Sequence, residues 1–244
     1  MPQTTINCDM GESFSLYVMG NDEAMMPMIS VANVACGFHA SDPEHMRRTV
    51  ALAKRCGVAV GAHPALPDLQ GFGRREMKIP PGELTSMIIY QVGALKGFLD
   101  AEGMALNHIK PHGALYGMAA RDEAVAHAVC DAAEVFGVPL MGLPGTAHER
   151  VYSERGQAFL AEFFADLDYD DDGRLIITRE HAAVDPALAA ERCRRAVADG
   201  ELVTTGGQVL PVRADTICVH SDTPNAVEVA RAARDAVQSI PGVN

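Results

Sequence analysis

Seven short segments rich in β-forming residues recur along this 244-residue chain, separated by longer stretches with helical periodicity. This alternation is typical of parallel strands joined by crossover helices, because parallel neighbours need a long connection. The predicted strands span residues 4–9, 30–36, 58–62, 105–110, 138–142, 158–164 and 216–220. Seven such units favour a closed or nearly closed, TIM-like β/α barrel, with a doubly wound open sheet as the competing arrangement.

The segments between the predicted strands carry helix and turn signals. Helices are predicted to begin near residues 42, 81, 121 and 223, and both Asp42 and Thr223 precede a proline and are predicted helix caps. Residues 168–180 and 201–212 break the alternation and are predicted to be turn-plus-strand insertions, the second with Gly206 and Gly207 as a two-residue hairpin turn. Because no linker or repeat divides the chain, residues 1–244 are expected to form one domain.

The charge balance argues against several classes of function. The formal net charge is −12, from 20 basic and 32 acidic residues, so the chain would repel nucleic acid and anionic membranes. Neither a signal peptide nor a membrane span is predicted, and the expected location is cytoplasmic. The six cysteines form no C-x-x-C pair and are predicted to be small buried apolar residues.

Polar residues follow six of the seven predicted strands. They are Asp9 and Glu12, His39 and Asp42, His63 and Asp68, Lys110 and His112, Asp166, and His220 and Asp222. In either parallel architecture the carboxyl ends of the strands lie on one face, where such folds build their sites. A lone histidine at a strand end is more often structural, but six clusters at six strand ends predict one shared catalytic mouth.

The segment NHIKPHGALYG, residues 107–117, shows how the chain would aim such groups. Lys110 ends a predicted buried strand, Pro111 stops the pairing, and Gly113 lets the backbone turn so that His112 reaches the same space. Strand alternation places His108 on the side of Lys110, one layer deeper. A buried lysine would lose its proton without an anion nearby, so we expect an acidic partner in direct contact with Lys110.

Several polar residues have two interpretations. Asp42 is predicted to be a cap rather than a site residue, whereas for Asp222 the two roles remain open. Arg74 and Arg75, in GFGRR, could clamp a carboxylate or phosphate, or could pair with surface acids. The histidines predicted to face solvent are His45, His127, His148 and His181.

Six segments in order resemble the LamB/YcsF family over about residues 4–237: INCDMGES, NVACGFHASDP, GAHPALPDLQGFGRR, HIKPHGALYG, FFADLDYDDDGRL and DTICVHSDTP. The resemblance implies a seven-stranded β/α barrel of the glycoside hydrolase/deacetylase type. It also implies ATP-dependent opening of the lactam of 5-oxo-L-proline to L-glutamate, together with two subunits (PxpB-like and PxpC-like) related to the halves of allophanate hydrolase. The chain departs from the family pattern at Thr5, Ser41 and Leu167, where the family has an acidic residue, a glycine and an arginine.

The chain has no phosphate-loop motif, no dinucleotide-binding glycine motif, no G-x-S-x-G and no H-E-x-x-H. ATP is therefore expected to be shared with, or supplied through, the partner subunits. Lactam hydrolysis needs a group that deprotonates water and cations that stabilise an oxyanion. The predicted catalytic residues are Asp9, Glu12, His39, His63, Lys110 and His112, and the predicted substrate-binding residues are Asn7, Asn33, Arg74, Asp166, His220 and Asp222.

Two other functions stay open from the sequence. The first is a metal-dependent hydrolase or deacetylase acting on another small amide or lactam, with Asp9, His39 and His63 as candidate ligands of a divalent ion. The second is a non-catalytic subunit that binds a small acid or serves as a scaffold.

Overall fold

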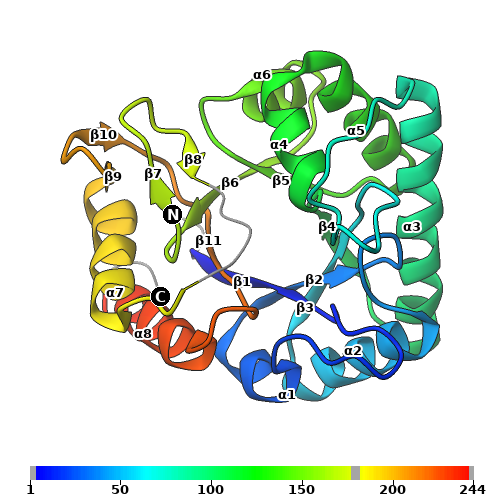
Figure 1. Cartoon of the computed structure of the whole chain (residues 1–244), viewed down its shortest axis with the longest axis horizontal. Helices are drawn as coiled ribbons and strands as arrows, with labels where there is room; N and C mark the ends of the chain where they lie inside the picture. The colour runs from blue at the N-terminus through cyan, green and yellow to red at the C-terminus, as the bar shows by residue number, and fades with distance from the viewer. Residues whose placement is uncertain (1–3, 177–181, 242–244) are drawn as a thin grey trace.

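The computed structural model describes residues 4–176 and 182–241, in which seven parallel strands close into a barrel (Figure 1). Around the barrel their order is β1, β11, β6, β5, β4, β3 and β2, and the circle closes where β1 pairs with both β2 and β11. The barrel strands are β1 (Thr5–Met10), β2 (Val31–Ala35), β3 (Ala59–His63), β4 (Leu106–Ile109), β5 (Leu140–Gly142), β6 (Phe159–Phe164) and β11 (Thr216–Val219). The predicted barrel is confirmed, and the open sheet is excluded.

Helices surround the barrel, with α2, α3 and α5 along one side and α7 and α8 along the other (Figure 1). They are α1 (Asp22–Met25), α2 (Pro43–Cys56), α3 (Pro81–Glu102), α4 (Gly113–Arg121), α5 (Glu123–Phe136), α6 (Ala147–Glu154), α7 (Pro186–Arg194) and α8 (Ala226–Gln238), with a 3₁₀ turn at Met26–Met28 and a π-helical turn at Arg195–Asp199. Among the described residues, no helix combines the length and apolar character needed to cross a membrane.

Helix α2 shows how local sequence sets an element. The Asp42 side chain accepts hydrogen bonds from the backbone N–H groups of Glu44 and His45, which confirms the predicted cap. Gly57 ends the helix in the left-handed conformation, with φ 70°. The corresponding prediction for Thr223 was wrong, because α8 begins only at Ala226.

The helix predicted from residue 121 proved to be the second of two. Helix α4 precedes it, and Asp122 serves both: its N–H donates to the carbonyl of Met118 at the end of α4, and its carboxylate caps α5 through the Ala124 N–H. The short helices α6 and α7 were also not predicted. Cys56 is exposed, contrary to prediction, whereas the other five cysteines are buried.

Both predicted insertions form antiparallel hairpins where they are described. Strands β9 (Glu201–Val203) and β10 (Val209–Pro211) pair as predicted. The predicted turn was wrong in position, because the Gly207 N–H donates to the Thr204 carbonyl and so places Thr205 and Gly206, not Gly206 and Gly207, at the centre of the turn. Gly207 takes φ 83°, which favours glycine. Strands β7 (Asp168–Tyr169) and β8 (Leu175–Ile176) form the other hairpin, and residues 177–180 of that prediction lie outside the described residues.

Candidate active site

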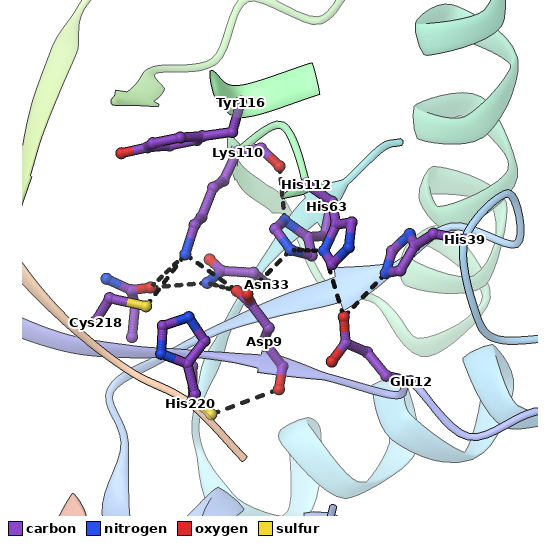
Figure 2. Close-up of polar contacts among 12 residues, drawn as sticks. Asp9, Glu12, Asn33, His39, His63, Lys110, His112, Tyr116, Cys218 and His220 are labelled. Atoms are coloured by element: carbon purple, nitrogen blue, oxygen red, sulfur yellow. Dashed lines mark hydrogen bonds and ion pairs between the residues drawn. The ribbon is translucent and has the colours of Figure 1, made fainter. Parts of the chain in front are cut away.

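Lys110 lies at the centre of the barrel mouth, directly after β4. Its Nζ is 3.1 Å from Asp9 Oδ1 and 2.7 Å from Glu162 Oε1, which confirms the predicted acidic contact (Figure 2 shows the contact with Asp9). Lys110 is only 2% exposed and Glu162 is fully buried. Burial alone would lower the pKa of Lys110, but Asp9, Cys218 and Glu162 outweigh it and raise that pKa well above its ordinary value.

An amide layer lies beneath Asp9 and fixes its carboxylate. Asn33 Nδ2 donates to Asp9 Oδ1 and to Asn7 Oδ1, each at 2.8 Å, and Asn7 Nδ2 donates to the Thr216 hydroxyl. His108 Nε2 is 2.7 Å from Asn33 Oδ1, in the deeper layer predicted for it. Asn33 therefore holds the Asp9 carboxylate directly and Asn7 acts through Asn33, while neither is among the residues that line the pocket.

Three histidines gather near Glu12, on the side of Asp9 that faces away from Lys110 (Figure 2). His39 Nε2 is 2.9 Å and His112 Nδ1 is 3.5 Å from Glu12 Oε1. His63 Nε2 is 3.0 Å from His112 Nδ1 and 3.1 Å from Asp9 Oδ2, and the rings of His39 and His112 stack at 3.7 Å. We call Glu12, His39, His63 and His112 the histidine cluster.

Burial is the largest influence on the pKa values of Glu12, His39 and His112. It raises the pKa of Glu12 to about 8, with a further contribution from the Asp9 charge. Burial, followed by the neighbouring imidazoles, holds the pKa values of His39 and His112 well below the ordinary value. The pKa of Asp9 is lowered, because His63 and Lys110 more than compensate for burial, which opposes its ionisation. The pKa values of Asp9 and Glu12, two acids of one pocket, are therefore shifted in opposite directions. Such separation is common where acid–base chemistry takes place.

The remaining predicted residues form two further pairs at the mouth. Asp166 accepts from the backbone N–H of His220 at 2.7 Å and lies 3.0 Å from its Nδ1. Burial opposes the charge on His220, but Asp166 raises its pKa to about 9. Arg74 Nη2 is 3.1 Å from Asp222, so Asp222 belongs to the mouth, and the cap position of α8 is taken by Asn225. Arg75 instead pairs with Asp68, away from the pocket lining.

These groups line a pocket that encloses about 590 Å³, part of it open to solvent. The predicted residues among its lining are Asp9, Glu12, His63, Arg74, Lys110, His112, His220 and Asp222. His39 and Asp166 lie behind this surface. Leu167, where the family pattern has an arginine, contributes an apolar wall together with Phe164 and Leu175.

Sequence reasoning missed Glu162, Tyr116 and Phe164. Glu162 joins Lys110 to Tyr116, whose hydroxyl donates to Glu162 Oε2 at 2.8 Å, and Phe164 places its ring 5.3 Å from Lys110 Nζ. One signal for Glu162 was present: it is the only acid within the apolar run AFLAEFF. His148, predicted to face solvent, is fully buried, and burial lowers its pKa to about 3. His127 is exposed as predicted, His45 is half-buried, and His181 lies outside the described residues.

Comparisons with known proteins agree on one group of relatives. The model of the LamB/YcsF family matches residues 4–241. Lactam utilization protein lamB of Emericella nidulans is 48% identical over 95% of this chain and 93% of its own length. A protein of Thermus thermophilus that is named as the A-type subunit of 5-oxoprolinase is 46% identical over 96% of this chain and 95% of its own length. The crystal structure of the lactam utilization protein from Thermus thermophilus superposes with a TM-score of 0.91 at 44% identity, covering 97% of this chain and 96% of that one.

Proposed function

Because the chain belongs to the LamB/YcsF family, we propose that it is the A-type subunit of a 5-oxoprolinase that opens the lactam of 5-oxo-L-proline to L-glutamate at the expense of ATP. We further propose that it acts with two partner subunits and that ATP is shared with or supplied through them. The relatives' names support the first point, since several are named as the A-type component of 5-oxoprolinase.

One observation carries the proposal: a buried lysine between two carboxylates faces a pocket that also holds a histidine cluster. Lys110 supplies a fixed positive charge 3.1 Å from Asp9, and only 2% of its own surface is exposed. A preorganised cation of this kind stabilises an oxyanion far better than one in solvent. Arg74 and His220 at the rim provide further positive charge for the carboxylate of a small acid.

The lactam imposes the order of steps. A five-membered lactam is a poor electrophile whose ring closure is favourable, so its opening needs an exergonic step. The amide oxygen takes the γ-phosphoryl group of ATP, ADP leaves, and the amide proton is lost. Water then adds to the activated carbon and loses a proton, the C–N bond breaks as the ring nitrogen gains one, and the resulting acyl phosphate reacts with a second water to give glutamate and phosphate.

Residues of the pocket match the needs of water addition. A proton acceptor is required beside the attacking water, and Glu12, His63 and His112 line the pocket within reach of one another. Lys110 faces the oxygen on which negative charge develops. Asp9 orients Lys110 and, through its depressed pKa, stays ionised at neutral pH.

Reconstitution tests this function. The chain, mixed with its two presumed partners, should release glutamate from 5-oxoproline only when ATP and all three proteins are present. Lys110→Ala should lower kcat about 10²–10³-fold, the typical loss for one oxyanion-stabilising group, while the complex still assembles. Full activity of that variant would favour a scaffold role, and absence of release from the complete mixture would refute the 5-oxoprolinase assignment.

A second candidate function is ATP-independent hydrolysis of another small amide or lactam with a metal ion. The observation in its favour is the convergence of four buried ligand-type side chains in the histidine cluster. Turnover that proceeds without ATP and stops after chelation would support it. Turnover that requires ATP and survives exhaustive chelation would exclude it.

A further inference from the structure

We propose that the histidine cluster is a binding site for one divalent transition-metal ion of the zinc class, with Glu12, His39, His63 and His112 as ligands. Each residue offers one ligand atom, an imidazole nitrogen or a carboxylate oxygen, and these four atoms all lie within 4.8 Å of one another. All four residues are buried. The set differs from Asp9, His39 and His63, the candidate ligands that the sequence offered. Asp9 is instead engaged by Lys110, whose charge would oppose a nearby cation.

The hydrogen bonds of His63 and His112 leave two lone pairs facing each other. His63 Nδ1 is 2.8 Å from the carbonyl oxygen of Lys110, and His112 Nε2 is 2.8 Å from that of Phe72. A carbonyl oxygen can only accept, so each ring donates its outer N–H to the backbone. In the neutral rings the inner nitrogens, His63 Nε2 and His112 Nδ1, then both carry lone pairs 3.0 Å apart. His63 Nε2 also lies 3.1 Å from Asp9 Oδ2, so these electron-rich atoms need a cation between them, either a proton or a metal ion. Outer N–H groups held by backbone carbonyls are the usual support of metal-bound histidines and favour the metal ion.

The spacing within the histidine cluster suits tetrahedral coordination. Zinc bonds of about 2.0–2.1 Å separate neighbouring ligand atoms by about 3.3 Å. The distances here are 3.0 Å from His63 to His112, 3.5 Å from His112 to Glu12 and 2.9 Å from Glu12 to His39. They fall on both sides of that value, so small side-chain shifts would bring the four atoms onto one ion. Imidazole and carboxylate together are a ligand set that zinc accepts.

The loop behind the histidine cluster is shaped around its rings. A Cβ on Gly73 would lie 2.8 Å from both His39 Cβ and His112 Cδ2, so only glycine fits at this φ of 65°. Phe72 takes φ 54°, a costly conformation for an aromatic residue, and its carbonyl lies 2.8 Å from His112 Nε2. Its ring lies nearly perpendicular to the rings of His39 and His112, with centroids 5.4 Å and 5.2 Å away. Burial leaves His39 Nδ1 without a hydrogen-bond partner among the described residues. Strain and close fit at one place indicate a site that is held in position.

Zinc binding by the full-length chain, without ATP, lactam or partner subunits, tests this inference separately from the proposed reaction. Protein stripped with chelator is titrated with Zn²⁺ by calorimetry, and the metal retained after dialysis is measured by mass spectrometry. We expect one equivalent. His39→Gln and His112→Gln should each weaken binding by more than the roughly 10–100-fold typical of losing an outer supporting group. His148→Gln, which removes a buried histidine outside the cluster, should retain wild-type affinity.

The inference would be overturned if the wild-type protein failed to bind Zn²⁺, or if His39→Gln and His112→Gln bound Zn²⁺ as tightly as the wild-type protein. The positive charge within the histidine cluster would then be a proton rather than a metal ion. If those variants do not fold, the visible spectrum of Co²⁺-loaded wild-type protein decides. Intense bands of a four- or five-coordinate ion are expected. Weak bands of an octahedral, water-ligated ion would also overturn the inference.

Discussion

Replacing Lys110 with methionine would remove the positive charge that lies between two buried carboxylates. Its Nζ is 3.1 Å from Asp9 and 2.7 Å from Glu162, and the Glu162 side chain is fully buried. Methionine preserves most of the side-chain volume, so the change is chiefly electrostatic. Asp9 would retain Asn33 and His63 as partners, whereas Glu162 would be left with the Tyr116 hydroxyl.

The magnitude follows from opposing contributions. At an effective dielectric constant of about 20, the attraction between Lys110 and Glu162 is about 6 kcal/mol, while each ion loses several kcal/mol on leaving water. Removing one partner of such a pair typically costs about 3–5 kcal/mol, because the other charge stays buried. Glu162→Gln in the Lys110→Met background should recover part of this loss, giving a coupling free energy of about 1–3 kcal/mol.

Urea unfolding at pH 7 of the wild-type protein, both single variants and the double variant measures this coupling, provided the denaturant slopes agree. Lys96→Met is the matched control: Lys96 pairs with Asp100 on the exposed surface of α3, so its loss should cost at most about 0.5 kcal/mol. Effects of Lys110→Met and Glu162→Gln that add to within about 0.5 kcal/mol would refute the reasoning.

Two more predictions concern the pH dependence of stability and the packing of glycines. Asp166 raises the pKa of His220 from 6.5 to about 9, so the pair's stabilisation is complete below about pH 6.5 and disappears as pH rises through about 9. The difference in unfolding free energy between wild type and His220→Gln should be about 3 kcal/mol near pH 6 and should largely vanish by pH 10. A difference that stays constant with pH would contradict this. Gly61→Ala would place a Cβ 2.0 Å from His108 Cε1 and should lower the free energy of unfolding by about 1–3 kcal/mol or more. Gly93 lies on an exposed face of α3, where an added Cβ would have no neighbouring atom within 4 Å, so Gly93→Ala should raise the free energy of unfolding by about 0.5–1 kcal/mol. Equal shifts of the two melting temperatures would contradict the packing argument.

The sequence predicted the strand ends well because strand alternation and the residues that stop pairing are local properties. Lys110, Pro111 and His112 show this: the strand, its break and the turn are encoded within a few positions. Asp9 and His63 could be placed with them because a parallel barrel brings all carboxyl ends to one face. Topology alone therefore sufficed to bring these side chains together.

What the sequence did not reveal depends on contacts between distant segments. Glu162 lies in an apolar strand, and only the closed barrel brings it to Lys110. His148 was assigned to solvent, but the missing side chain of Gly142 leaves room for its ring, since a Cβ there would lie 2.7 Å from it. Helix α4 was not predicted because Pro111 and Gly113 suggested a loop, and they do end the strand, but the chain continues at once into a helix.

The pairing of β1 with β11 has a consequence for synthesis on the ribosome. β1 can pair with β2 early, but its other edge stays open until β11 has been translated, about 10–40 s later at about 5–20 residues per second. During that interval Asp9 lacks the hydrogen bond from the Ser221 hydroxyl to its carbonyl, and the unpaired edge can attract other nascent chains. We therefore expect this edge of the growing polypeptide to stay open to such contacts until the last strand arrives.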